Sequence, residues 1–245
     1  MSLIVVAPAY MKRDCLPEFL DRTTTALENQ NVEFEIIVVV DGDQDLSSIV
    51  VNSFRARDAR IRGIVHSENL GKGAAIRTGA LAAKHSKYLA YFDADLDINA
   101  KSLLAYIDFL EKNPNIDIVY ASKLHRDSEV NYPLLRRVLS KVLQFIVRLS
   151  LNIEVNDTQT GLKVGRTDAM KKAILKTETN GFAFDLEFFV NASRNRCAFA
   201  SMPVHLDFQF NSTISISHIF QILNDLFRIR TKINRDKVEK SVGIL

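Results

Sequence analysis

The sequence predicts an α/β protein built on a doubly wound, mostly parallel sheet flanked by helices. Short hydrophobic runs alternate with helix-like segments through the first half of the chain. These runs are continuously apolar, which is typical of parallel strands covered on both faces. Several of them end abruptly in polar or acidic residues, as strands do where they reach a ligand-binding edge. With 245 residues, 47% of them hydrophobic, the chain can bury a sizeable core.

The predicted elements follow one another without long gaps. Strands are expected at Leu3–Ala7, Glu35–Val40, Ile61–His66 and in the run that begins at Tyr88. Helices are expected at Leu16–Gln30, Ser47–Arg57 and Gly73–Lys84, and connections of this length favour parallel neighbours. A helix near Lys101–Lys112 and a strand at Ile116–Ala121 continue the alternation.

The strand that begins at Tyr88 runs into three carboxylates, Asp93, Asp95 and Asp97. Residues two apart in an extended chain point the same way, so Asp93 and Asp95 can offer oxygens to one cation. Carboxylates that share a site with substrate phosphates are typical of Mg²⁺ or Mn²⁺ binding. The alternative interpretation is a solvated acidic turn after a strand.

A glycine-rich loop precedes the third helix, at Asn69-Leu70-Gly71-Lys72-Gly73. It lacks the Ser or Thr that follows Lys in a phosphate-binding P-loop, and the dinucleotide fingerprint is missing after the first strand. A lysine at the start of a helix can still meet a phosphate. A simple helix-entry loop is the alternative.

Two further segments carry polar residues of interest. Residues 156–163 form a dense polar stretch, and Asp185 and Glu187 stand inside the apolar run Gly181–Phe189. Carboxylates in apolar surroundings need partners, and raised pKa values would suit a general base. Asp185 could instead cap the helix that follows.

The net charge of +3 hides two basic segments, at 134–151 and 228–240, each with a charge of +4. Arg137, Lys141 and Arg148 share one face of a predicted helix, which is either a core helix with one wet stripe or a helix on a membrane surface. The last predicted helix, Ile216–Ile233, is amphipathic. We therefore expect a catalytic domain over 1–210, with an amphipathic helix and basic tail over 211–245 packed on or beside it.

Several classes are disfavoured by the composition. Cys15 and Cys197 lie far apart, which suggests neither a disulfide framework nor a zinc site. No stretch reaches the roughly 18 apolar residues that span a bilayer. No helix-turn-helix, zinc or aromatic-stacking signature predicts a nucleic acid partner. The sequence favours a cytoplasmic protein, peripheral to the membrane, and leaves a homo-oligomer open.

Six motifs in order resemble glycosyltransferase family 2, which has the GT-A fold, and most of all its dolichyl-phosphate or polyprenyl-phosphate sugar synthases. The motifs are Ala7-Pro8-Ala9-Tyr10, Val40-Asp41-Gly42-Asp43-Gln44-Asp45, Asn69–Ala75, Asp93-Ala94-Asp95-Leu96, Asp157–Lys163 and Gly181–Asp185. The resemblance runs from Leu3 to about Lys232. It implies a nucleotide diphosphate sugar, UDP-glucose-type or GDP-mannose, as donor and a polyprenyl phosphate as acceptor.

The resemblance also implies a set of donor-binding residues. Pro8, Ala9 and Tyr10 would line the nucleoside pocket, and Asp41 would bind the base. Lys72 and Ser212 would lie near the donor, the latter beside its diphosphate. Asp93 and Asp95 would hold Mn²⁺ or Mg²⁺ on the pyrophosphate.

Basic residues would meet the acceptor. By the resemblance, Lys123 and either Arg136 or Arg137 would bind the lipid phosphate. Two departures affect the donor site: Met11-Lys12 replaces the usual Asn-Glu, and the Arg often found shortly before Ser212 is not evident. Lys163 stands where mannosyl relatives commonly have Arg, which tilts the prediction toward a glucose-type donor.

The predicted reaction is inverting transfer of a hexose to an acceptor oxygen. A polyprenyl phosphate is anionic near pH 7, because its second phosphate pKa is about 6, and needs no general base. A saccharide or protein hydroxyl would need one, for which Asp185 and Glu187 are the candidates. A non-catalytic nucleotide-binding scaffold and a nucleotidyltransferase are the further alternatives.

Overall fold

The computed structural model describes residues 2–128, 155, 157–181, 183–204 and 231. Three predicted site residues, Arg136, Arg137 and Ser212, lie outside these ranges. So do the predicted helix within 134–151, the predicted C-terminal helix and the predicted boundary between 210 and 211.

Seven strands and six helices make up this described part of the chain. The strands are β1 (Ser2–Ala9), β2 (Glu33–Asp41), β3 (Ile61–His66), β4 (Tyr88–Phe92), β5 (Ile118–Ser122), β6 (Leu162–Arg166) and β7 (Phe199–Pro203). The helices are α1 (Leu16–Glu28), α2 (Ser47–Arg55), α3 (Lys72–Ala82), α4 (Lys101–Lys112), α6 (Thr167–Ile174) and α7 (Phe184–Arg194). All nine elements predicted up to residue 122 are present, with ends within about three residues of their predicted positions.

The strands form one sheet in the order β3-β2-β1-β4-β6-β5-β7. All neighbours are parallel except at β6, which runs antiparallel to both β4 and β5. The predicted mostly parallel, doubly wound sheet is therefore confirmed. The sequence did not predict β6, because Lys163 is the second residue of this short strand and makes it look like part of the polar stretch before it.

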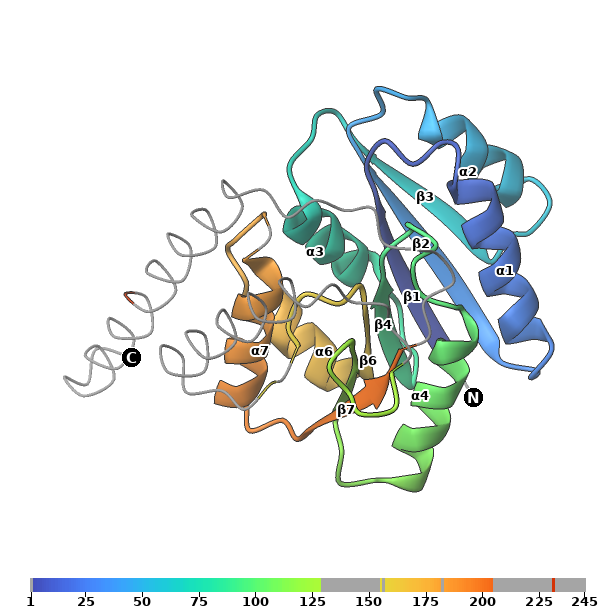
Figure 1. The fold of residues 1–245 in the computed structure, drawn as a ribbon. Coiled ribbons are helices and arrows are strands. Elements are labelled where there is room, and N and C mark those ends of the chain that lie inside the picture. Colours follow the sequence, from blue (N-terminus) through green and yellow to red (C-terminus); the bar gives the residue numbers. More distant parts are fainter. Residues whose placement is uncertain (1, 129–154, 156, 182, 205–230, 232–245) are drawn as a thin grey trace.

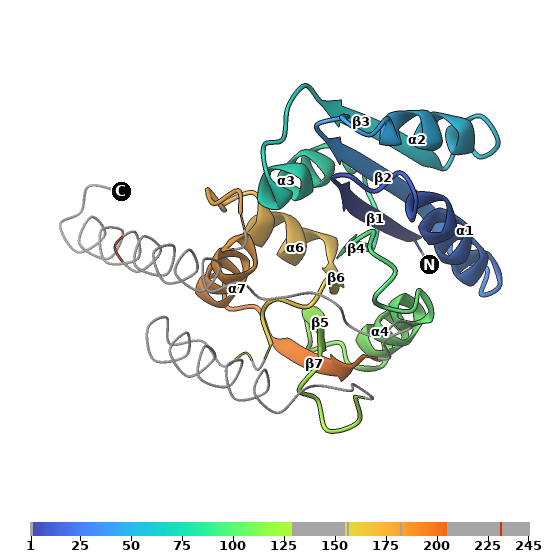
Figure 2. The same ribbon diagram turned by 45° about the horizontal axis from the view of Figure 1, so that its top comes forward.

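Helices cover both faces of the sheet (Figures 1 and 2). One apolar core lies between the sheet and α1, α2 and α4, and Phe19, Leu103 and Ile107 are among its buried residues. A second core packs α3, α6 and α7 on the other face, through residues such as Ile76, Met170 and Phe188. Helix α3 lies very close to β1, since a Cβ on Gly79 would come within 2.3 Å of Val6 Cγ1.

The order of the strands places the site. The chain reverses its winding direction between β1 and β4, and ligands of open α/β sheets bind at this switch point, outside the carboxyl ends of the strands. Because β6 is antiparallel, its first residue rather than its last lies at this edge, where Leu162 pairs with Phe92. The segment before β6 therefore joins the loops that follow β1, β2 and β4.

Candidate active site

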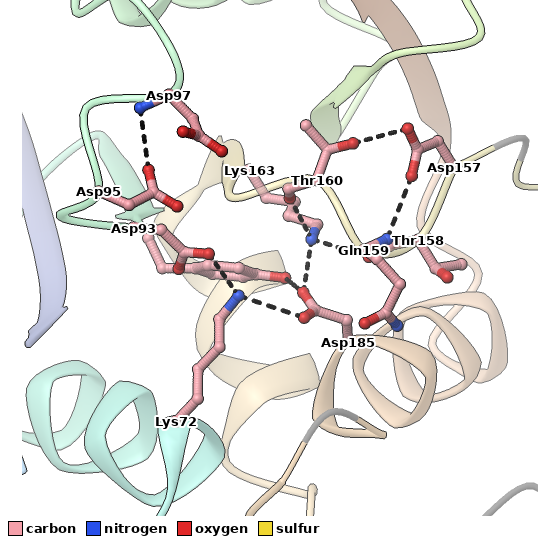
Figure 3. A network of polar contacts seen from close by, with 11 residues as sticks. Lys72, Asp93, Asp95, Asp97, Asp157, Thr158, Gln159, Thr160, Lys163 and Asp185 are labelled. Carbon is pink, nitrogen blue, oxygen red and sulfur yellow. Dashed lines mark hydrogen bonds and ion pairs between the residues drawn. The ribbon is translucent and has the colours of Figure 1, made fainter. Parts of the chain in front are cut away.

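Three acids follow β4 in a tight loop at the switch point (Figure 3). The Asp93 backbone N–H donates to the Gly161 carbonyl over 2.8 Å, which ties the loop to the segment before β6. Asp95 Oδ1 accepts a hydrogen bond from the Asp97 N–H over 3.1 Å. Leu96, between them, has a φ of 64°, a backbone conformation that costs a non-glycine residue of order 1 kcal/mol. Strain of this kind is common at functional loops.

The electrostatics of this loop favour a cation. Burial, with the nearby charges of Asp93 and Asp97, raises the pKa of Asp95 to about 6. Burial also raises the pKa of Asp97. Carboxyl groups whose pKa is raised in this way gain stability when a positive charge comes between them.

A divalent metal fits the residues present. Asp93 Oδ1 is buried and has no hydrogen-bond partner among the described residues. Buried acceptors of this kind are uncommon and are often explained by a bound water or ion. Carboxylate oxygens are the ligands that Mg²⁺ and Mn²⁺ prefer. Within the described ranges no cluster of three or more acidic, His or Cys side chains could hold a metal, so the remaining ligands would have to come from substrate and water.

Lys72 approaches the acids from the start of α3. Its Nζ lies 2.7 Å from Asp93 Oδ2 and 3.4 Å from Asp185 Oδ2, so one ammonium bridges two carboxylates (Figure 3). Burial alone would lower the pKa of Lys72, but Asp185 and Asp93 together raise it. The side chain is still 25% exposed, which leaves it within reach of a ligand.

Glycines allow this approach of α3. Gly71 has a φ of 98°, and a Cβ there would lie 2.5 Å from the Asn180 carbonyl oxygen. The Gly73 N–H donates to that same carbonyl over 2.8 Å. The glycine-rich loop therefore serves to dock the start of α3 against the segment that precedes α7.

Asp185 lies in the first turn of α7 and is almost completely buried. Its Oδ1 accepts hydrogen bonds from the Tyr91 hydroxyl, over 2.8 Å, and from Lys163 Nζ. Its Oδ2 faces Lys72. Burial alone would raise the pKa of Asp185, but Lys163 and Lys72 hold it below its usual value. It does not cap α7, because Ala183 is the N-cap residue and no side chain caps it.

Lys163 is the part of this cluster that the sequence did not reveal. Its side chain is fully buried, and its Nζ donates to the Thr158 carbonyl over 2.9 Å, the Thr160 carbonyl over 2.7 Å and Asp185 Oδ1. Three acceptors satisfy the three N–H groups of an ammonium. A lysine one residue into a strand, with a buried aspartate later in the chain, was the available signal.

The polar segment before β6 is ordered by Asp157. Its carboxylate accepts hydrogen bonds from the Lys123 N–H (2.9 Å), the Gln159 N–H (3.2 Å) and the Thr160 hydroxyl (2.6 Å). This places Lys123 at the same edge as the acids. Burial lowers the pKa of Lys123, against the opposing charges of Asp157 and the three acids after β4.

Asp41 lies at the end of β2 with 2% of its surface exposed. Its oxygens accept the N–H groups of Leu70 (2.9 Å) and Gly71 (2.7 Å), and Oδ1 lies 2.8 Å from His66 Nδ1. These contacts fix the glycine-rich loop to β2 and β3. The role of Asp41 as a base-binding residue stays a prediction.

The other residues predicted to bind the nucleoside also lie at or directly after the carboxyl end of a strand. Pro8 and Ala9 are the last two residues of β1 and are buried, whereas Tyr10 is 42% exposed at the edge of the sheet. All three lie next to the switch point, and their contact with a nucleoside stays a prediction.

The Glu187 side chain is bound to the segment that precedes α7. Its Oε2 accepts hydrogen bonds from the N–H groups of Glu178 and Thr179 and from the Thr179 hydroxyl, each over 2.8 Å. The side chain is buried and holds the segment that receives α3. This geometry favours a structural role over the predicted alternative of a general base.

Comparison with known proteins decides the family. The model of the family described as glycosyl transferase family 2 matches residues 4–174, about 70% of the chain. The chain belongs to glycosyl transferase family 2. The predicted resemblance is confirmed, and the protein is a glycosyltransferase with the GT-A fold.

Among curated relatives of this family 2 enzyme is dolichyl-phosphate beta-glucosyltransferase ALG5D of Trichomonas vaginalis, 31% identical over 91% of this chain and 71% of the relative. The dolichyl-phosphate beta-glucosyltransferase of Drosophila melanogaster is 27% identical over 83% of this chain and 66% of its own. Among solved structures, glucosyl-3-phosphoglycerate synthase from Mycobacterium tuberculosis, in complex with Mn²⁺, UDP-glucose and phosphoglyceric acid, has a TM-score of 0.68. It is 16% identical and covers 94% of this chain and 80% of its own. At that identity the likeness shows the fold alone.

The described part of the family 2 enzyme contains no helix long and apolar enough to cross a bilayer.

Proposed function

We propose that this enzyme transfers a hexose, with inversion, from a nucleotide diphosphate sugar to a polyprenyl or dolichyl phosphate at a membrane surface, with a divalent metal at Asp93 and Asp95. The observation that carries the proposal is the state of Asp185, the candidate base. Two lysines and a tyrosine donate to its carboxylate, and its pKa is held low. A carboxylate in that state is a poor proton acceptor.

The second candidate base, Glu187, accepts three hydrogen bonds from the segment before α7. A hydroxyl acceptor would have to lose its proton to one of these two groups. A phosphate monoester is already an anion near pH 7, because its second pKa is about 6, and can attack the donor without a base. The hydrogen bonds that Asp185 and Glu187 already accept therefore favour a phosphate as the acceptor.

The relatives support the same acceptor class. Two of those compared are named dolichyl-phosphate beta-glucosyltransferases, and another is an undecaprenyl-phosphate 4-deoxy-4-formamido-L-arabinose transferase from Shewanella sediminis. The glucosyl names, together with Lys163 at its position, support a UDP-glucose-type donor over GDP-mannose.

In the proposed reaction, a bound Mn²⁺ or Mg²⁺ would neutralise the charge that develops on the departing nucleotide diphosphate. Asp93 and Asp95 would hold it. Lys72, at the start of α3, would add a second positive charge beside the phosphates. Asp185 would keep that lysine charged and in place.

The rest of the proposed site binds the two substrates. Pro8, Ala9, Tyr10 and Asp41, with Ser212, would bind the donor nucleotide. Lys123, with Arg136 or Arg137, would bind the lipid phosphate. The basic segments at 134–151 and 228–240 would hold the enzyme, as a peripheral protein, on the cytoplasmic face of the membrane.

The test is a turnover screen of the purified protein with Mn²⁺. UDP-glucose, UDP-GlcNAc and GDP-mannose are each supplied with and without a short polyprenyl phosphate. The expected result is lipid-dependent turnover of UDP-glucose that is lost in Asp95→Ala. Donor turnover that the polyprenyl phosphate does not increase would refute the proposed acceptor.

Asp185→Asn separates the two acceptor classes further. A phosphate acceptor predicts that this variant, if its melting temperature shows it is folded, loses about tenfold or less in kcat. A group that acts as general base contributes about 10²- to 10⁴-fold, so a loss of that size would contradict the phosphate acceptor.

A further inference from the structure

The position of Lys72 sets it in competition with any cation for the same carboxylate. Asp93 is the candidate metal ligand, and its Oδ2 lies 2.7 Å from Lys72 Nζ. Oδ1 of the same carboxylate is the buried oxygen without a partner among the described residues. A divalent cation on Asp93 would therefore stand within a few ångströms of the ammonium, and like charges that close repel strongly.

Asp93 itself has little freedom to separate the two charges. Its N–H is bound to the Gly161 carbonyl over 2.8 Å. A Cβ on Gly161 would lie 2.7 Å from Asp93 Oδ2 and 2.8 Å from Asp93 Cβ, so the side chain already packs against the backbone there. The carboxylate is held in one orientation, and relief has to come from movement of the lysine.

The backbone that carries Lys72 is equally fixed. On one side Asp41 accepts the N–H of Gly71 over 2.7 Å. On the other, the Gly73 N–H binds the Asn180 carbonyl, and the Arg77 guanidinium donates to the Thr179 carbonyl over 2.8 Å. The flexible part of Lys72 is its four-carbon stem, which carries the ammonium.

The Lys72 side chain is partly exposed. The Lys72 side chain is 25% exposed, whereas Asp185 behind it is 2% exposed and is fixed by the fully buried Lys163. Asp185 is thus fixed on the buried side of Lys72, and room for the side chain to move lies on its exposed side. An anionic diphosphate that arrives with the cation would offer it new oxygens there.

We propose that Lys72 is an exchangeable counter-ion: it neutralises Asp93 until the metal and the donor bind, and then transfers its hydrogen bond from Asp93 to a phosphate oxygen of the donor. This inference rests on the proposed metal and donor site. It assigns Lys72 a role opposed to metal binding in the absence of nucleotide and favourable to nucleotide binding in the presence of metal.

The test measures binding by calorimetry for the wild type, Lys72→Met and Lys72→Arg, first with Mn²⁺ alone and then with UDP in saturating Mn²⁺. In Lys72→Met we expect Mn²⁺ alone to bind about five- to tenfold more tightly, because the competing charge is gone. We expect UDP to bind about tenfold or more weakly, because a charge-assisted hydrogen bond is lost. Lys72→Arg, which keeps the charge, should bind Mn²⁺ as the wild type does, and so should Lys112→Met, which removes an exposed lysine paired with Asp108.

Opposite changes in the two affinities would support the exchange. If Lys72→Met weakens Mn²⁺ binding or leaves it unchanged, the lysine stays on Asp93 as a bridge and the inference is wrong.

A second measurement uses the wild type and so does not depend on the folding of a variant. The rate at which an amine-reactive reagent modifies Lys72 is followed by peptide mass spectrometry. It should rise when Mn²⁺ alone is added and fall again when UDP follows, and a rate that Mn²⁺ does not raise would refute the exchange. Failure of both the wild type and Lys72→Met to bind Mn²⁺, with or without UDP, would refute both the exchange and the proposed metal. Absence of turnover onto lipid, with the opposite affinity changes intact, would refute only the proposed acceptor.

Discussion

Replacement of Lys163 by Met tests the buried charge cluster most directly. The substitution keeps the apolar stem but removes the ammonium, whose side chain is 0% exposed and pairs with Asp185 at 2% exposed. It removes one donor each from the Asp185 carboxylate, the Thr158 carbonyl and the Thr160 carbonyl, and the last of these keeps the N–H of Leu162. Removal of one partner from a buried ion pair costs about 3–5 kcal/mol.

This loss should be visible as a lower melting temperature. In a chain of this size each kcal/mol shifts the midpoint by about 2–4 °C, which gives a fall of roughly 6–20 °C. Urea denaturation with matched refolding curves would supply the free energy of unfolding. Lys112→Met is the control, because its pair with Asp108 is 72% and 61% exposed, and removal of such a pair costs less than about 1 kcal/mol.

The stability difference between the wild type and Lys163→Met should depend on pH. Asp185 has a lowered pKa in the folded protein, so its ion pairs stabilise the fold above the unfolded pKa of about 3.9, and this contribution is lost as the pH falls through the folded value. The gap between wild type and Lys163→Met should be full at about pH 7 and shrink below about pH 4. A gap no larger than that of Lys112→Met, or one that grows in acid, would refute the reasoning.

Three further perturbations test other parts of the site. Gly161→Ala should lower kcat/KM by about tenfold or more, because its Cβ would lie 2.7 Å from Asp93 Oδ2 and displace that carboxylate. Gly181→Ala, where a Cβ meets nothing within 4 Å, should leave kcat/KM unchanged, and equal effects of the two would contradict the proposed role of Asp93. Glu187→Gln should destabilise the fold by about 1–3 kcal/mol in urea denaturation, since two part-buried N–H groups lose their charged acceptor. The variant should retain turnover below its melting temperature. A Glu187→Gln variant that is folded but inactive would instead support Glu187 as a general base. Removal of divalent metal by EDTA should abolish turnover and Mn²⁺ should restore it, in the wild type but not in Asp95→Ala; full activity in EDTA would refute metal dependence.

The first 122 residues could be predicted because local pattern and long-range structure agree there. The runs at Ile36–Val40 and Tyr88–Phe92 are continuously apolar and bounded by polar residues, and each lies in a strand buried on both faces. Their carboxyl ends meet at one edge, which is why Asp41 and Asp93 could be placed near each other from the order of the strands alone.

The charge cluster could not be predicted in the same way. Lys163 and Asp185 are separated by 22 residues and belong to different elements, and their contact depends on β6 pairing antiparallel with β4. Hydrophobic periodicity does not indicate such a strand when its second residue is a lysine. The sequence therefore revealed that the Asp185 carboxylate is energetically costly to bury, but not that Lys163 and Lys72 neutralise it.

The reversed direction of β6 also bears on how the chain can vary beside the active site. The chain leaves the sheet at Ser122, at the end of β5, and returns at Leu162, the first residue of β6. Because these strands are antiparallel, both points lie on the edge that carries the acids. The chain therefore leaves the sheet and rejoins it at the same edge, beside the active site. A change in the length of the connection between these two points would need no new strand order, and it would leave the strands that carry Asp41 and Asp93 in place.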